Sequence, residues 1–255
     1  MKENIKELFR DWNETIIWSC LQGVMGGVRT NSAEDAAMAI LGDFAFFAGK
    51  PSEEMVMFMT EDCEKEFLIM VPQNEEWGEV IERCYGKKAR KVTRYAIKKE
   101  KDIFDVCKLE KAVLELPEGY EIKLLEEHEY HLCKNAGWAN DLVSQFKDYD
   151  TYKKLGLGVV VLKEKELVAG ASSYSRYKEG IEIEIDTRED HRRKGLAYAC
   201  GAKLILECLK RGLYPSWDAQ NIHSVHLAKK LGYEFDHAYT AYEVAAEART
   251  HSRFE

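Results

Sequence analysis

The sequence predicts an α/β (α+β) fold: a mixed, mostly antiparallel sheet flanked by helices, with an additional N-terminal α/β domain. Three observations support this prediction. Short strand patterns alternate with helical patterns through the second half of the chain, several strand patterns follow one another directly, and a Pro–Gly turn separates this half from an earlier group of elements. The 255 residues leave room for one large or two small domains, at about 150 residues each.

The boundary between the two parts is expected near residues 102–118. This stretch follows a basic segment, includes a helical pattern over 105–115 and ends at Leu116-Pro117-Glu118-Gly119. Pro and Gly so close together mark a turn, here directly before a new strand pattern. We therefore predict an N-terminal α/β domain of unknown role over residues 1–112 and a second domain over residues 118–255.

The N-terminal part begins with a helical pattern over about 2–14 and a glycine-containing turn at 23–27. Ser32, followed three residues later by Asp35, has the spacing of a capping box, which predicts a helix over 33–41. The remaining patterns predict strands over 44–47, 66–71 and 91–97, and a helix over 77–85.

The C-terminal part alternates more regularly. Gly212 and Gly232 each follow a helical pattern, as expected of glycines that end helices. The predicted helices cover residues 126–133, 138–147, 195–210 and 224–231. The predicted strands cover residues 120–125, 158–162, 166–173, 180–187, 214–218 and 233–243.

Composition and charge argue against several function classes. A net charge of -8 is unusual for a dedicated nucleic-acid-binding protein. No apolar stretch is long enough to span a bilayer, and the charged N-terminus lacks an apolar secretory segment, so neither nucleic acid nor membrane is an expected partner. Seven widely spaced cysteines without a CxxC pair predict reduced thiols in a cytoplasmic protein. His223 and His226 lack a third ligand of suitable spacing, so no metal site is predicted.

The most informative segment is a strand pattern that leads through a basic turn into a helix. Isoleucines at 181, 183 and 185 alternate with acidic residues at 182, 184 and 186, so the two kinds face opposite sides of the strand. Backbone N–H groups from Arg193 to Ala197 are expected to point into one concavity at the positive end of the following helix. Gly195, which has no Cβ, lets a ligand approach the backbone closely.

This turn predicts an anion site suited to a pyrophosphate. Arg192, Arg193 and Lys194 add positive charge beside the backbone N–H groups. The alternative interpretation is a solvated basic start of a surface helix. Basic residues oppose the helix dipole at that end, however, so they bring no local benefit unless an anion binds.

Two motifs resemble those of the GCN5-related N-acetyltransferase (GNAT) superfamily. Arg192-x-x-Gly195-x-Ala197, between a strand and a helix, resembles the superfamily's acyl-CoA pyrophosphate motif. Asn221-x-x-Ser224-x-x-Leu227-x-x-Lys230-Leu-Gly-Tyr233 resembles its second motif. The motifs follow in the expected order with a strand pattern between them, and the resemblance covers roughly residues 118–245.

The whole chain also resembles the subfamily that includes the zwittermicin A resistance acetyltransferases. This second resemblance says little about the substrate of this chain. It rests on four short segments: Gly23-Val-Met-Gly26, Gly42-Asp-Phe44, Gly170-Ala-Ser-Ser-Tyr174 and Tyr214-Pro-Ser-Trp-Asp218.

The superfamily resemblance implies acetyl-CoA as cosubstrate and assigns its site by position. The turn over Arg193, Lys194, Gly195, Leu196 and Ala197, with Arg192 beside it, would hold the pyrophosphate. Backbone groups of Ile185 and Thr187 would pair with the pantetheine arm as an added strand would. Asn221 would contact the same arm, and Ser224 belongs to the same motif. The sheet would open between Thr187 and the 214–218 strand, so that the thioester can enter.

The reaction implied is transfer of an acetyl group to a primary amine by direct attack in a ternary complex. A protonated amine must first lose a proton, which a nearby carboxylate accepts. Glu182 and Glu184 share one face of the strand, and their mutual repulsion raises the pKa of one of them, so either is a candidate base. The alternative is that both only form the polar face of a half-exposed strand. A backbone N–H near Ile185 is the candidate donor to the oxyanion.

One position departs from the superfamily pattern. Ala228 stands where many relatives have a tyrosine that protonates the leaving thiolate. The general acid is therefore unassigned, with Tyr198, Ser224 and Tyr233 as weak substitutes.

Two functions remain from the sequence. The first is an N-acetyltransferase acting on an amine of a small molecule, such as an antibiotic or a metabolite. The second is a catalytically silent acyl-CoA-binding module that senses CoA and engages a partner through its N-terminal domain. The oligomeric state, including a homodimer, is left open.

Overall fold

The computed structural model describes residues 2–62 and 67–245. Within them, the chain divides into two compact units: a first unit of residues 2–93 with 240–245, and a second unit of residues 94–239. The predicted domains, 1–112 and 118–255, do not coincide with these units and stay a prediction. No helix of the described residues has the length and apolar character needed to cross a bilayer.

The first unit contains an N-terminal sheet and the last strand of the chain. Its strands, which include only residues 89–93 of β5 and residues 240–245 of β12, run in the order β1-β2-β3-β4-β12-β5, with β3 and β4 parallel. Those strands are β1 (Gly27–Thr30), β2 (Ala36–Leu41), β3 (Phe44–Gly49), β4 (Phe67–Pro72), β5 (Ala89–Ile97) and β12 (Phe235–Ala245). The helices are α1 (Glu3–Glu7), α2 (Thr15–Gln22), α3 (Glu53–Asp62), α4 (Glu75–Tyr85) and the 3-10 turn η1 (Gly86–Lys88).

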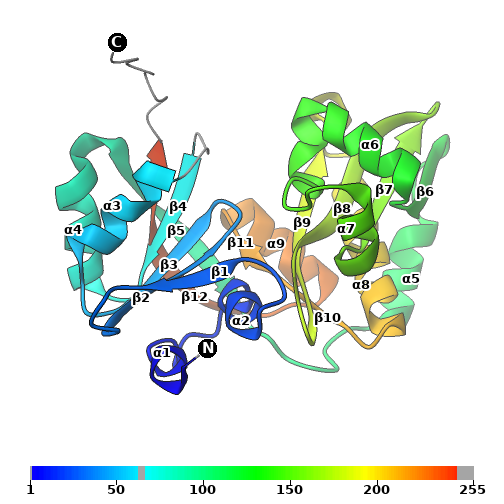
Figure 1. The fold of residues 1–255 in the computed structure, drawn as a ribbon. Coiled ribbons are helices and arrows are strands. Elements are labelled where there is room, and N and C mark those ends of the chain that lie inside the picture. The colour runs from blue at the N-terminus through cyan, green and yellow to red at the C-terminus, as the bar shows by residue number, and fades with distance from the viewer. Residues whose placement is uncertain (1, 63–66, 246–255) are drawn as a thin grey trace, which may run out of the picture. The chain divides into compact units, whose positions relative to one another are not determined.

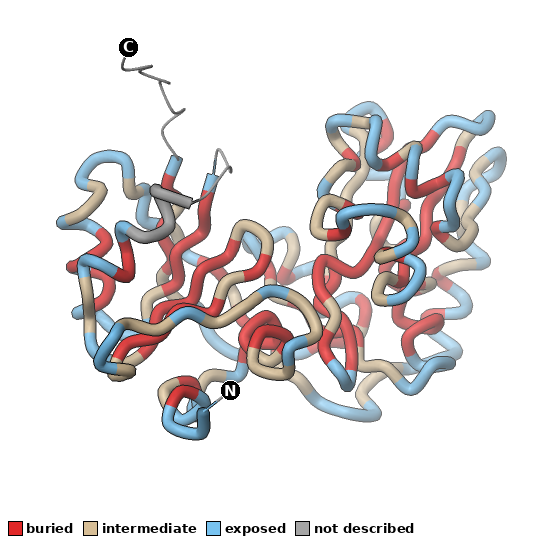
Figure 2. Tube along the Cα trace, viewed as in Figure 1, coloured by how far each residue is buried: buried red, intermediate tan, exposed pale blue. Residues whose placement is uncertain are grey.

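Apolar side chains from three parts of the sequence form the core of the first unit. Met38 and Phe47 come from the N-terminal strands, Trp77 from α4, and Tyr242 and Val244 from the C-terminal strand β12. Strands β2, β3 and β4, labelled in Figure 1, are buried over most of their length (Figure 2). The unit therefore depends on the end of the chain for part of its core.

The helix predicted over 33–41 is wrong, because residues 36–41 form strand β2. The Asn31 side chain accepts hydrogen bonds from the backbone N–H groups of Asp35 and Ala36, which closes a turn instead of a helix start. Ala36–Leu41 then pairs with β3 over its whole length. Small and apolar residues that are buried on both faces fit such a central strand as well as a helix.

The second unit contains a five-stranded sheet in the order β10-β9-β8-β7-β6. Its strands are β6 (Tyr120–Leu124), β7 (Gly158–Lys163), β8 (Glu166–Tyr177), β9 (Gly180–Thr187) and β10 (Tyr214–Ser216). Only the β9–β10 pair is parallel, and the other three pairs are antiparallel. This arrangement confirms the predicted mixed, mostly antiparallel sheet.

Helices cover both faces of this sheet (Figure 1). Helices α5 (Val106–Leu114) and α8 (Leu196–Lys210) pack on one face, where isoleucines of β9 join the core. On the other face lie α6 (Glu127–Asn135), the 3-10 segment η2 (Gly137–Leu142) and α7 (Tyr149–Leu155). The helix predicted over 138–147 is therefore replaced by η2, and α7 was not predicted. A short 3-10 turn, η3 (Glu189–His191), and helix α9 (Ile222–Leu231) complete the unit.

The single strand predicted over 214–218 is two strands in different sheets. Tyr214–Ser216 pairs with β9, whereas β11 (Asp218–Ala219) pairs with the end of β5. The chain thus leaves β9 after Ser216. Arg94 forms a buried ion pair with Asp218 at 2.6 Å, and the Tyr239 hydroxyl donates to the same carboxylate at 2.8 Å. These contacts attach β11 to β5.

Candidate active site

Strand β9 presents an apolar face and an acidic face, as its alternation predicts. Ile181 and Ile183 are buried in the core beneath α8. Glu182, Glu184 and Asp186 lie on the opposite face, toward η2. The strand therefore separates the core of the unit from a row of carboxylates.

The two candidate bases differ in their surroundings. Glu182 is 5% exposed, whereas Glu184 is partly exposed to solvent. Burial, with smaller contributions from Asp186 and Asp141, raises the pKa of Glu184 to about 8, although Arg94 and a hydrogen bond from the Ile185 backbone oppose the increase. A carboxyl group with this pKa takes up and releases a proton near neutral pH, which a general base must do.

Two buried hydroxyl groups lie beside Glu182 in the sheet. Ser175 of β8 and Ser216 of β10 are its register partners, so all three side chains are on one face. Both serines are 0% exposed, and their Oγ atoms have no hydrogen-bond partner within the described residues. Glu182 thus lies deep in the sheet, at the last pair that joins β9 to β10.

Beyond Glu182, strands β9 and β10 separate. Their pairing ends at Glu182 and Ser216, and among the described strands only β8 pairs with the rest of β9. Ile185 and Thr187 lie along this separated part of β9. Their backbone therefore borders an edge where an extended group can pair as a strand does.

The turn after β9 presents backbone N–H groups at the start of α8. Gly195 is the N-cap residue, and no side chain caps the helix. Its φ is 81°, and Arg193 also has a positive φ of 60°. A Cβ at Gly195 would meet nothing within 4 Å, so the space in front of it is open. An uncapped N-terminus with open space before it fits an anionic diphosphate.

The basic side chains of this turn lie close to their own backbone. Arg192 Nε donates to the Thr187 carbonyl at 3.3 Å, and Lys194 Nζ donates to the Asp190 carbonyl at 2.9 Å. Arg192, Arg193 and Lys194 are all exposed, whereas Leu196 is buried and Ala197 is partly exposed. Leu196 thus attaches the helix start to the core, while the three cations stay accessible.

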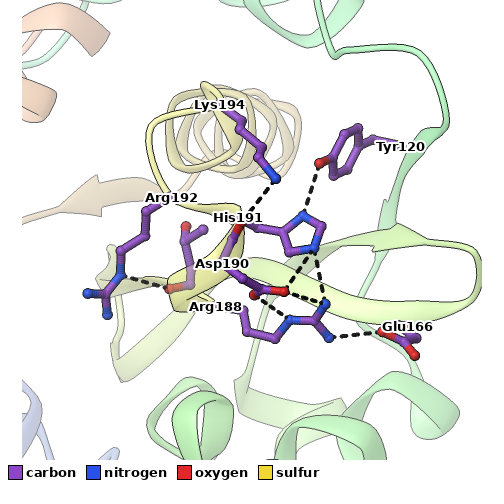
Figure 3. A network of polar contacts seen from close by, with 8 residues as sticks. Tyr120, Glu166, Arg188, Asp190, His191, Arg192 and Lys194 are labelled. Carbon is purple, nitrogen blue, oxygen red and sulfur yellow. Dashed lines mark hydrogen bonds and ion pairs between the residues drawn. The ribbon is translucent and has the colours of Figure 1, made fainter.

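A polar network that the sequence did not predict lies behind the turn (Figure 3). His191 contacts Tyr120 from β6 at 2.9 Å and Arg188 at 3.0 Å. Arg188 also bonds Asp190 and, across to β8, Glu166. No sequence pattern places Tyr120 and Glu166 beside this turn, because they come from other strands of the sheet.

Asn221, which the sequence predicts to contact the pantetheine arm, has a structural role as a helix cap. It is the N-cap of α9, and its Oδ1 accepts from the backbone N–H groups of His223 and Ser224 at 3.0 and 3.1 Å. The amide nitrogen carries two further donor hydrogens. Ser224 lies in the first turn of α9 and is partly exposed.

None of the three substitutes for the missing tyrosine stands out as a general acid. Tyr233 is buried, and its hydroxyl donates to the Pro215 carbonyl at 2.6 Å. Lys230 lies over the Tyr198 ring, 4.0 Å from its centre. Ala228 is 0% exposed, so it offers no functional group to the site. In the part of the chain that the structure describes, no group of three His, Cys, Asp or Glu side chains could hold a metal ion.

Known acetyltransferases are similar to this chain in sequence. A GNAT acetyltransferase family model matches residues 6–242. An uncharacterized N-acetyltransferase of Bacillus subtilis, YdfB, is 32% identical over 139 residues, which are 52% of this chain. The match covers 51% of YdfB, so this chain spans about half the length of that curated relative.

Solved structures extend the similarity over almost the whole chain. A GCN5-related N-acetyltransferase-like protein from Streptococcus suis is 46% identical with a TM-score of 0.89, over 95% of this chain and 98% of that one. A GCN5-related N-acetyltransferase from Kribbella flavida is 16% identical with a TM-score of 0.57, over 93% and 96%, and shows the fold alone. The family model and the first of these structures together confirm the predicted superfamily: the chain belongs to the GNAT acetyltransferase family.

Proposed function

We propose that this chain is an N-acetyltransferase that transfers the acetyl group of acetyl-CoA to a primary amine of a small molecule, by direct attack in a ternary complex. The observation that supports this best is the position of Glu184. A carboxyl group whose pKa is raised to about 8 lies on the strand that leads into an uncapped helix N-terminus. The candidate proton acceptor on β9 is thus followed, after the end of the strand and the short turn η3, by the candidate anion site.

The cosubstrate is proposed to lie along the separated part of β9. Its diphosphate would bind the N–H groups from Arg193 to Ala197, with Arg192 beside them. The pantetheine arm would pair with backbone groups of Ile185 and Thr187, and Asn221 and Ser224 would face it from the start of α9. The support is the end of the β9–β10 pairing at Glu182 and Ser216 and the open space at Gly195.

Glu184 is the proposed general base. The amine nitrogen attacks the thioester carbonyl carbon and forms a C–N bond, the C–S bond breaks, and the surplus amine proton passes to the Glu184 carboxylate. A backbone N–H near Ile185 would donate to the oxyanion. The partial exposure of Glu184 supports this role over Glu182, which is 5% exposed. The donor that protonates the CoA thiolate stays unassigned.

The test is incubation with acetyl-CoA and a panel of primary amines, followed by mass spectrometry. Acetylated product is expected, and Glu184→Gln should lower kcat by about 100-fold or more, the usual contribution of a general base. Glu182→Gln is the matched control on the same face and should lose less. If both variants keep the full rate at pH 7, neither Glu182 nor Glu184 is the base.

The same experiment separates the enzyme from a silent module. Binding of acetyl-CoA without an acetylated product across the whole panel would favour an acyl-CoA-binding module that engages a partner through its N-terminal domain. An aminopolyol in the panel tests the resemblance to zwittermicin A resistance acetyltransferases. That subfamily, a homodimer and a cytoplasmic location stay predictions.

A further inference from the structure

His191 is the most buried residue of the turn between β9 and α8. It is 7% exposed, while its neighbours Asp190 and Arg192 are exposed. Its ring meets the edge of the Tyr120 ring, with 5.7 Å between the ring centres. His191 and Leu196 therefore attach the turn to the body of the unit through buried side chains.

The partners of His191 fix which ring nitrogen carries the hydrogen. Nε2 lies 3.0 Å from a terminal nitrogen of Arg188 and 3.5 Å from Asp190 Oδ2. Arg188 can only donate, so the shorter contact requires a hydrogen-free Nε2 that accepts. The hydrogen is then on Nδ1, which donates to the Tyr120 hydroxyl at 2.9 Å. Burial lowers the pKa of His191, with Lys194, Arg188 and Lys163 acting in the same direction and Asp190 opposing them. This lowered pKa favours the neutral ring, which the contact with Arg188 requires.

The guanidinium group of Arg188 is engaged by protein acceptors on every side. Nε and one terminal nitrogen donate to Asp190 at 2.8 and 3.1 Å, and the other terminal nitrogen donates to Glu166 at 3.0 Å. Two carboxylates thus balance its charge. Arg188 differs in this respect from Arg192 and Arg193, which are exposed.

We propose that His191 and Arg188 are positioning residues, which hold the turn over 193–197 in the shape that binds the diphosphate of acetyl-CoA. The proposal rests on the proposed function for the identity of the anion. The acceptor nitrogen of His191 orients the Arg188 guanidinium, and Arg188 connects the turn to Glu166 on β8 (Figure 3). Neither side chain touches the cosubstrate.

The role assigned to each ring nitrogen leads to a paired test. In His191→Gln, the side-chain oxygen occupies the place of Nε2 and still accepts from Arg188. In His191→Asn, the amide occupies the place of Nδ1, which keeps the bond to Tyr120 and removes the acceptor for Arg188. Both variants remove the aromatic ring, so a general loss of packing affects them alike.

The affinity for acetyl-CoA is measured by titration calorimetry at constant pH and salt. His191→Gln should stay within about threefold of the parent protein, and His191→Asn should bind about tenfold more weakly, as expected from losing one hydrogen bond to a charged group. Arg188→Lys keeps the charge but not the forked geometry, so it should also weaken binding about tenfold. The acceptor-amine KM should not change. His128→Gln, at an exposed histidine of α6, is the control.

Hydrogen exchange in the free protein tests the positioning without any ligand. The amides of residues 193–197 should exchange faster in His191→Asn and Arg188→Lys than in His191→Gln. Equal affinities and equal exchange rates in the Gln and Asn variants would overturn the proposal, and so would parent-like binding by Arg188→Lys. If the parent protein does not bind acetyl-CoA, the proposed function fails, while the exchange rates still report whether the two residues order the turn.

Discussion

At the scale of single residues, two glutamates of one strand face differ in what they can do. Their sequence context is the same, so the alternation of β9 predicted both as candidates. The difference comes from residues elsewhere in the chain: Asp141 on η2 lies near Glu184, and Ser175 and Ser216 flank Glu182 in the sheet. Such long-range neighbours are invisible in a local pattern.

The pKa of Glu184 predicts how activity depends on pH. Only the deprotonated carboxylate accepts a proton, so kcat/KM should increase with pH and level off above about pH 8. A pH–rate profile with a good amine substrate measures this. A profile in which the parent protein levels off near pH 5 would contradict the assignment of Glu184 as base.

The same group predicts a change in stability. In an unfolded chain the Glu184 carboxyl group has the ordinary pKa of 4.5, whereas in the folded chain its pKa is about 8. The free energy of unfolding therefore decreases as the pH rises through this window. Glu184→Gln removes this penalty, so its Tm should exceed that of the parent by a margin that grows from pH 5 to pH 8. An equal margin at both pH values would show that the carboxyl group titrates normally.

The shape of the turn requires a strained backbone conformation at Arg193. A non-glycine residue at a φ of 60° is unfavourable by about 1–2 kcal/mol. Arg193→Gly should therefore raise the free energy of unfolding in urea by about 1 kcal/mol, although it removes a cation from the proposed anion site. The matched control is Arg192→Gly, where φ is -64° and no strain is relieved. If both variants are less stable than the parent protein, the backbone of Arg193 is not strained in the folded state.

At the scale of elements, Asn221 combines a helix cap with a proposed contact to the pantetheine arm. Asn221→Ala should lower stability by about 1 kcal/mol, because two backbone N–H groups lose their acceptor. Asn221→Asp keeps the acceptor and removes the amide donors. Its Tm should stay near the parent value while the affinity for acetyl-CoA falls. Unchanged affinity in the Asp variant would leave Asn221 with the capping role alone.

The separation of β10 and β11 depends on a buried ion pair. Arg94→Met leaves the Asp218 carboxylate without its cation, in a site where both side chains are at most 10% exposed. Breaking such a pair costs about 3–5 kcal/mol, and an apolar pair in its place restores much of the loss. Urea unfolding of Arg94→Met and of Arg94→Met with Asp218→Leu measures both effects. A double variant as unstable as the single one would argue against the ion pair as the cause.

Some elements of the fold could be predicted from the sequence, and others could not. Strand β9 and helix α8 were predicted closely, because strict alternation and a basic Gly-containing turn are local features. The helix predicted over 33–41 was wrong, because the small apolar residues of this segment fit a central strand and a helix equally well. Residues 214–218 were predicted as a single strand. Their division into two strands depends on the ion pair between Asp218 and Arg94 of β5, which joins residues far apart in the chain.

At the scale of the whole molecule, the contacts of α5 bear on where the second unit begins. Leu109 and Ala112 of α5, together with Ile97, belong to the same core cluster as the helix α8 residues. A fragment of residues 94–239 should therefore unfold cooperatively, whereas residues 118–239 should lack a fixed tertiary structure. Near-ultraviolet circular dichroism and thermal unfolding of the two fragments test this, and a well-folded shorter fragment would favour the predicted boundary at 118.

Strand β12 has a consequence for how the protein is made. Tyr242 and Val244 belong to the core of the first unit, although that unit is otherwise encoded by the first third of the chain. On the ribosome, the nascent N-terminal segment therefore lacks these two core side chains until residues 240–245 have been translated. Over that interval, the exposed apolar surface of this segment is a binding site for chaperones.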